Sequence, residues 1–184
     1  MTRRPRLSTL LAVVCLLAGG LTFAAPASAA PTGLLDITCT PPSSNSTTFS
    51  PPLTNTPALV TRTGSAQFGP CVSLSRPDVT SGSSSRPPTS LLLDCSDLLT
   101  ASSTTTTITW NTGETSTLSL NSTATIIGAA LITTATGTVT AGLFQGDTVV
   151  RTTVAPALTV TTCTLGLGNV PSLYALSTLE ITSL

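Results

Sequence analysis

The chain has 184 residues, with seven arginines, no lysine and no histidine. The missing residue types exclude Ser-His-Asp and Cys-His catalysis, histidine-ligated metals and lysine Schiff bases. Beyond residue 29, four arginines stand against seven carboxylates, a net charge of −3, which makes nucleic acid and anionic membrane surfaces poor partners.

The first 29 residues have the pattern of a secretory signal peptide. Three arginines within the first six residues precede an apolar segment at residues 7–25, and Ala27-Ser28-Ala29 forms an A-x-A cleavage signal. Cleavage there leaves a single domain, residues 30–184. We therefore expect a protein that is secreted, extracellular or cell-wall associated, with no membrane contact after cleavage.

Four cysteines follow the signal: Cys39, Cys71, Cys95 and Cys163. An even number in an exported chain predicts two disulfides, for which three connectivities exist. We favour Cys39–Cys71 and Cys95–Cys163, because these bonds tie the first strand to the next and the third strand to the core. Without a C-x-x-C spacing or histidine, we expect no metal and no cofactor.

Apolar and β-branched runs predict strands through the first half of the chain. They are placed at residues 34–40, 47–50, 59–68 and 71–74. Residues 80–88 are rich in serine and proline and predict a flexible loop. Residues 90–99 fit either a buried strand or a short helix, because periodicity cannot decide so short a run.

The next segment predicts a β-hairpin whose register can be derived from its pattern. Apolar residues share one face on each arm only if Trp110 pairs with Glu114 and Thr106 with Leu118. The three-residue loop then ends at Gly113, which takes the left-handed conformation such loops need. We expect the Trp110 side chain to lie in the core.

Further strands are predicted at residues 129–141, 148–154, 158–164 and 176–184. The chain then has eight to ten strands and no helix. Two packed antiparallel sheets would bury the alternating apolar faces. The predicted fold is therefore an all-β, immunoglobulin-like antiparallel β-sandwich with two disulfides.

Several motifs carry a resemblance over most of the mature chain: ITWNTGETSTLSL at residues 108–120, GTVTAGLFQGDTVV at 137–150 and CTLGLGNV at 163–170. With ITC at 37–39, CVS at 71–73 and CSDLL at 95–99, the chain resembles a family of small secreted actinobacterial proteins. The resemblance implies secretion, two disulfides and a β-rich domain. The family is uncharacterised, so the resemblance implies no activity.

Paired carboxylates are the remaining route to catalysis. Asp94 with Asp97, or Glu114 with Asp147, could act as the two carboxylates of a small glycoside hydrolase. A calcium site could use Asp94, Asp97 or Asp78, although no recognisable loop spacing supports it. These residues stand at turns and strand ends, where structural roles are common, so we expect no enzyme activity and assign no catalytic residue.

We expect a non-enzymatic binding module for an extracellular protein or glycan. For sugar stacking the chain offers only Trp110 and Tyr174. An alternative is a self-assembling structural protein of the cell exterior, because low charge, missing lysine and long β-branched strands weaken the usual protection of sheet edges. The uncharged run at residues 115–146 contains IIGAALI, so we expect a monomer that can associate through an exposed strand edge.

Overall fold

The computed structural model describes residues 34–183. The signal peptide expected at residues 1–29 lies outside these described residues. Ten strands, one short α-helix and one turn of 3-10 helix make up the described part. The strands are β1 (Leu35–Cys39), β2 (Ser44–Leu53), β3 (Ala58–Phe68), β4 (Cys71–Ser73), β5 (Gly82–Leu93), β6 (Ser102–Trp110), β7 (Thr115–Ile127), β8 (Ala130–Gly142), β9 (Thr148–Pro156) and β10 (Val170–Thr182). The 3-10 helix η1 (Ser96–Leu99) lies between β5 and β6, and α1 (Leu158–Thr164) lies between β9 and β10.

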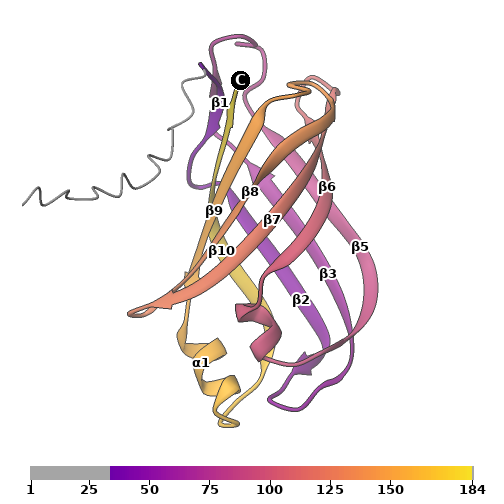
Figure 1. The fold of residues 1–184 in the computed structure, drawn as a ribbon, viewed down its shortest axis with the longest axis vertical. Coiled ribbons are helices and arrows are strands. Elements are labelled where there is room, and N and C mark those ends of the chain that lie inside the picture. Colours follow the sequence, from indigo (N-terminus) through magenta and orange to yellow (C-terminus); the bar gives the residue numbers. More distant parts are fainter. Residues whose placement is uncertain (1–33, 184) are drawn as a thin grey trace, which may run out of the picture. The chain divides into compact units, whose positions relative to one another are not determined.

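Eight of the strands close into an antiparallel barrel (Figure 1). The pairings run in the order β2-β3-β5-β6-β7-β8-β9-β10, and β10 pairs back onto β2. The predicted immunoglobulin-like sandwich is therefore wrong. A sandwich and a barrel both bury every second side chain, so the alternating pattern fits either. The closing ladder joins the two ends of the barrel sequence, and no local signal predicts such a contact.

The closing strand β10 serves two neighbours along one side. Its first half pairs with β2, from Val170 opposite Leu53 to Leu176 opposite Ser44. Its second half pairs with β1, which in turn pairs with β4. The strands β1 and β4 thus extend the sheet beside the barrel without belonging to its wall.

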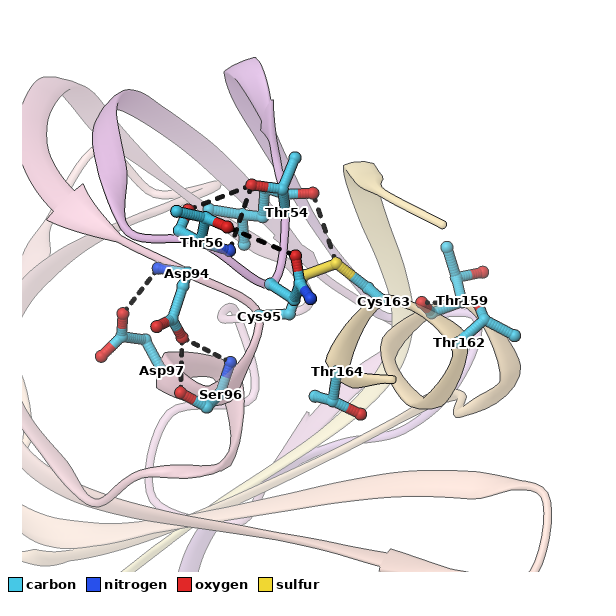
Figure 2. The surroundings of a disulfide bond; sticks show 12 residues. Thr54, Thr56, Asp94, Cys95, Ser96, Asp97, Thr159, Thr162, Cys163 and Thr164 are labelled. Atoms are coloured by element: carbon cyan, nitrogen blue, oxygen red, sulfur yellow. Dashed lines mark hydrogen bonds between the residues drawn. A yellow bond between two sulfur atoms is a disulfide. The ribbon is translucent and has the colours of Figure 1, made fainter. Parts of the chain in front are cut away.

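Both predicted disulfides are confirmed. Cys39 of β1 lies directly opposite Cys71 of β4 and is bonded to it. Cys95, just before η1, is bonded to Cys163 of α1 (Figure 2). On the chain-entropy view, closing loops of 32 and 68 residues stabilises the fold by about 4 kcal/mol each.

The register predicted for the first hairpin is confirmed. Thr106 pairs with Leu118, and the backbone N–H of Trp110 donates to the carbonyl of Glu114 at 2.9 Å. Gly113 has a φ of 86°, the left-handed conformation that the short loop requires.

The predicted burial of Trp110 is also confirmed. The residue is 2% exposed, and its indole Nε1 donates to Ser116 Oγ at 2.8 Å. The ring meets Phe144 edge-on, with 6.0 Å between the centroids. Hydrogen bonding satisfies the indole N–H while the ring is buried, which is the usual requirement for a core tryptophan.

The strand predicted at residues 158–164 is wrong, because this segment forms α1. Val160 and Cys163 are its buried residues, so one face of the helix packs inward. The hydroxyls of Thr161 and Thr162 donate to carbonyls one turn earlier, at 3.0 Å each. Packing and a covalent bond to Cys95 thus override the strand preference of a threonine-rich segment.

The flexible loop predicted at residues 80–88 is also wrong, because β5 begins at Gly82. This strand pairs with β3 over most of its length but with β6 only at Gly82 and Ser83. Pro87 and Pro88 lie beyond that short contact, where one side of the strand needs no hydrogen-bond donors. An edge position explains how a strand tolerates this composition. In the ambiguous segment 90–99, the structure combines the end of β5 with η1.

Buried apolar side chains form two separate clusters. The first surrounds Trp110 and includes Ile37, Phe68, Ile108, Leu118 and Ile181. The second adjoins α1 and includes Phe49, Leu53, Val60, Leu131 and Val160. The barrel strands contribute to both clusters, and the polar site described below lies along the same strands between these two groups of residues.

Gly82→Ala tests the packing of the first cluster. A Cβ at this position would lie 2.7 Å from Trp110 Cε3 and 2.9 Å from Ile108 Cγ2, so we expect a loss of about 1–3 kcal/mol in the free energy of unfolding. At Gly64 on β3 a Cβ would meet no atom closer than 3.5 Å. Gly64→Ala should therefore be neutral or slightly stabilising. Urea unfolding compares the two variants, and equal stabilities would contradict the placement of Gly82 against the indole ring.

Candidate functional site

A cavity of about 220 Å³ lies inside the barrel. All eight barrel strands contribute residues to its lining, and Leu98 of η1 adds an apolar side chain. Much of the lining consists of hydroxyl groups from serine and threonine. The volume is several times the share of one water molecule in the liquid, about 30 Å³, so the cavity has room for a small molecule.

Three arginines line this cavity: Arg62 on β3, Arg86 on β5 and Arg151 on β9. The strand register carries their side chains inward. Arg151 lies opposite the buried residues Ala135 and Leu179 on its two neighbouring strands, and successive residues of a strand point to opposite faces. Among the described residues that line the cavity, none is an aspartate or glutamate. The cavity therefore carries three positive charges and no negative one.

Among the described residues, the hydrogen-bond acceptors of these arginines are neutral groups. Arg86 Nη2 donates to Thr104 Oγ1 at 3.2 Å, and Arg151 Nε donates to Ser177 Oγ at 3.3 Å. The Arg151 guanidinium lies 5.3 Å from the centroid of the Phe68 ring, in cation–π geometry. Within the described chain, the buried atoms Arg62 Nε and Arg151 Nη2 have no hydrogen-bond acceptor.

The electrostatics of this group are unfavourable. Burial, and then repulsion from Arg86, lowers the pKa of Arg151 to about 10. The same two causes lower the pKa of Arg62. Buried cations in proteins are normally paired with carboxylates, because an unpaired buried charge is costly. A fold that buries the Arg151 guanidinium near Arg86 without a carboxylate sacrifices stability at this position.

The barrel wall has little backbone pairing between β5 and β6. These strands pair only at Gly82 with Trp110 and Ser83 with Thr109, and then diverge toward η1 (Figure 1). Beyond the paired residues, both strands contribute to the cavity lining, with Ser84 to Arg86 on one side and Thr104 on the other. The Arg86–Thr104 hydrogen bond joins the two strands there.

Asp94 and Asp97, one predicted carboxylate pair, serve as local caps around η1. Figure 2 shows the Asp94 carboxylate turned toward Ser96, whose backbone N–H donates to it at 2.7 Å. The Asp97 carboxylate accepts from the backbone N–H of Asp94 at 2.8 Å. Hydrogen bonds from Ser96 lower the pKa of Asp94. Both carboxylates thus have structural partners in the turn that carries Cys95.

The second predicted pair, Glu114 and Asp147, is engaged with different partners. Glu114 forms an ion pair with Arg76, which also binds Asp78 at 2.9 Å. Hydrogen bonds from Arg76 lower the pKa of Asp78 and of Glu114. Asp147 instead interacts with Asp36. None of these carboxylates lines the cavity.

Neither of the two aromatic residues considered for sugar stacking lines the cavity. Trp110 is buried in the first apolar cluster, and Tyr174 on β10 is 59% exposed. Among residues 34–183, no group of three or more His, Cys, Asp or Glu side chains could hold a metal ion. Within the same range, no helix is long and apolar enough to cross a membrane.

The segment expected to form an exposed edge lies within the barrel wall. It spans the turn from β7 to β8, and β8 pairs with β7 on one side and with β9 on the other. Ile132 has a backbone partner on both sides. Association through this strand would require those pairs to open, and self-association itself stays a prediction.

Sequence reasoning missed the arginine group. The alternation of side chains along the strands could have revealed it. Arg62 stands two residues after Val60, and Arg151 stands two residues after Val149. Both valines are buried. An arginine in phase with buried valines points into the core. Taken alone, each looks like an isolated charge, and only the closed barrel brings the three strands around one space.

Comparison with known proteins adds no relative: no family model, curated protein or solved structure matches the chain. The resemblance to secreted actinobacterial proteins therefore stays a prediction from the motifs.

Arg151→Met tests the electrostatic cost of the site. In buffer without multivalent anions, we expect the free energy of unfolding to rise by about 1–3 kcal/mol, because the change removes a buried charge that no carboxylate compensates. Since the pKa of Arg151 is lowered to about 10, its penalty is complete below that pH and falls as the pH rises above it. The advantage of the variant over the wild type should narrow accordingly.

The control is Arg76→Met, which removes an arginine paired with two carboxylates. This variant should be no more stable than the wild type. Urea unfolding at neutral pH and above pH 10 makes the comparison. A destabilised Arg151→Met variant at both pH values would contradict the electrostatic account of the site.

Asp147→Asn tests the acid pair at the start of β9. Burial raises the pKa of Asp147, and the hydrogen bond and charge of Asp36 raise it further. The folded state therefore favours the protonated form, and the stability this gives is lost as the pH rises through the raised pKa. The variant should be more stable than the wild type at neutral pH and equal to it in acid.

For Asp78→Asn we expect a change in stability of the opposite sign. Because Arg76 lowers the pKa of Asp78, this carboxylate stabilises the fold above its ordinary pKa and loses its effect in acid. The variant should be less stable than the wild type at neutral pH. Thermal melts across the acidic range measure both differences, and equal pH profiles for the two variants would contradict the assignment.

Proposed function

We propose that this protein is an extracellular, non-enzymatic binding protein that holds a small molecule inside its barrel. The observation that carries the proposal is the cavity of about 220 Å³, which all eight barrel strands line. Barrels of eight strands have an interior just wide enough to be filled by side chains or to hold one small ligand. The analogy with eight-stranded barrels that hold a small ligand supports a binding role, and it does not identify the ligand.

The lining favours binding over chemistry. Its polar groups are arginines, hydroxyls and one asparagine amide, all of which orient a ligand through hydrogen bonds. General acid–base catalysis normally uses histidine, carboxylates, lysine, tyrosine or cysteine. Histidine and lysine are absent from the sequence, and no described lining residue belongs to the other three types.

The two alternative functions find less support. A carboxylate-dependent hydrolase would need two carboxylates across a substrate site, but Asp94 and Asp97 cap η1, and Glu114 is engaged with Arg76. A self-assembling structural protein of the cell exterior would need free strand edges. Closure of the barrel pairs most of its strands on both sides.

The extracellular assignment rests on two independent features. Two disulfides are typical of proteins that fold in an oxidising compartment. The first 29 residues carry the charge, apolar segment and cleavage pattern of a signal peptide. Peripheral contacts with an extracellular protein or glycan are compatible with this role, since the proposed ligand occupies the interior.

The test is to fill the cavity. Ser122 on β7 lines it, whereas Ser119 on the same strand is exposed, so Ser122→Leu and Ser119→Leu form a matched pair. A panel of neutral, cationic and anionic small molecules is screened against wild type by ligand-observed NMR. Compounds that bind in the barrel should lose at least about tenfold in affinity with Ser122→Leu, because the larger side chain occupies their space.

Ser119→Leu should leave the same affinities unchanged. Circular dichroism establishes that both variants are folded. Binding that survives in Ser122→Leu, or a panel in which no compound binds the wild type, would contradict the proposed function.

A further inference from the structure

We propose that the ligand is a small multivalent oxyanion, a hydroxyl-bearing molecule with phosphate, sulfate or carboxylate groups, held by Arg62, Arg86 and Arg151. The inference rests on the proposed function, since it names the chemistry of the molecule that occupies the barrel. The charge and the hydrogen-bonding groups of the site select one class of ligand.

The charge of the cavity lining indicates an anionic ligand. Three of the four arginines at residues 34–183 line one cavity, whereas the fourth, Arg76, is paired with Asp78 and Glu114 elsewhere. The chain thus has carboxylates available for pairing, yet the described lining of the cavity contains none. A ligand with two or three negative charges would supply the missing counter-charge and relieve the repulsion among the guanidinium groups.

The three arginines line one cavity from three different strands. Repulsion from Arg86 contributes to the lowered pKa of both Arg62 and Arg151, so Arg86 lies close enough to interact with each of them. Guanidinium groups present planar forks of N–H donors that match the oxygens of phosphate and carboxylate. An oxyanion between them can receive hydrogen bonds from more than one side of the barrel.

Two buried N–H donors belong to the arginines of the cavity. Arg62 Nε and Arg151 Nη2 are buried, and no described protein group accepts a hydrogen bond from either atom. A buried donor without an acceptor is costly, and a charged one more so. Both donors belong to cavity-lining arginines, so a bound oxyanion is the partner that their position and charge call for.

The remaining lining describes the body of the ligand. Hydroxyls of Thr104, Ser122, Thr133 and Thr153 surround the arginines. These groups can donate to or accept from the hydroxyls of a sugar or hydroxy acid. Phe49, Leu120 and Leu173 add apolar side chains to the same lining. A long acyl chain would leave the hydroxyls without partners. The mixture of hydroxyls and apolar side chains therefore favours a hydroxylated molecule with a carbon skeleton, such as a sugar.

Arg86 also lies where the barrel wall has few backbone pairs. It stands on β5 and donates to Thr104 on β6, beyond the two paired positions. Clefts lined by one charge sign raise the local concentration of the opposite ion. An oxyanion can displace the Thr104 hydroxyl from this guanidinium.

Isothermal titration calorimetry of the secreted, disulfide-bonded protein tests the inference. The probes are glucose 6-phosphate, glucose 4,6-disulfate and citrate, each with more than one negative charge at neutral pH, with glucose as the neutral control that shares the sugar body. Ionic strength is held constant with sodium chloride. Direct binding is measured, because phosphate, sulfate and citrate salts stabilise many proteins without specific contact.

We expect at least one anionic probe to bind and glucose not to bind. Affinity for that probe should fall about 10–100-fold in Arg62→Met and in Arg151→Met, as the loss of charge-assisted hydrogen bonds requires. Arg76→Met, which removes an arginine outside the cavity, should change it less than about twofold. The identity of the best probe distinguishes phosphate, sulfate and carboxylate as the source of the charge.

Two results would overturn the inference. If glucose binds as tightly as its phosphate and sulfate esters and Ser122→Leu abolishes this binding, the barrel holds a neutral ligand; the proposed function stands and the anion assignment fails. If no anionic probe binds, or if one binds equally to wild type, Arg62→Met and Arg151→Met, the three arginines are not the recognition site. Circular dichroism and a thermal melt establish that each variant is folded before its affinity is interpreted.

Discussion

The ladder between β10 and β2 is the contact on which the rest of the structure depends. Without it, the strands from β2 to β10 would form one open sheet, and the inward faces of β3 and β9 would lie far apart along that sheet. Closure places Arg62 and Arg151 around one space and gives the backbone of both terminal strands hydrogen-bond partners. The same contact thus completes the wall and creates the site.

Stability and function are divided along the barrel interior. The two apolar clusters bury most of the large side chains, including Trp110 in one and Phe49 in the other. Burial of that kind is the main favourable term in folding. The polar cavity opposes it, since it holds cations apart from any carboxylate. A small domain can tolerate such a site because two disulfides and the apolar clusters offset its cost.

Local features of this fold could be derived from the sequence, and long-range ones could not. The hairpin register around Trp110 follows from parity and from Gly113, whereas the disulfide pairing was only the favoured one of three connectivities. The barrel does not, because alternation specifies which side chains are buried but not how the sheet curves. Likewise, the threonine-rich segment of α1 has a strand composition, and only packing of Val160 and the bond at Cys163 make it a helix. The arginine site was hidden for the same reason, since Arg151 on β9 meets Arg62 and Arg86 on the paired strands β3 and β5 only across the closed barrel.

The connection between β5 and β6 is anchored at two points. Cys95 follows β5, and its bond to Cys163 ties the connection to α1. The Cys95 backbone N–H also donates to the Thr54 carbonyl, at 2.9 Å, which ties the same point to the turn after β2. From there η1 leads into β6, and its Leu98 lines the cavity. Beyond Ser83 the two strands do not pair, and Pro87 and Pro88 on β5 have no N–H to donate. The disulfide thus fixes the connection that contributes Leu98 to the cavity, so the fold and the lining of the site share one covalent support.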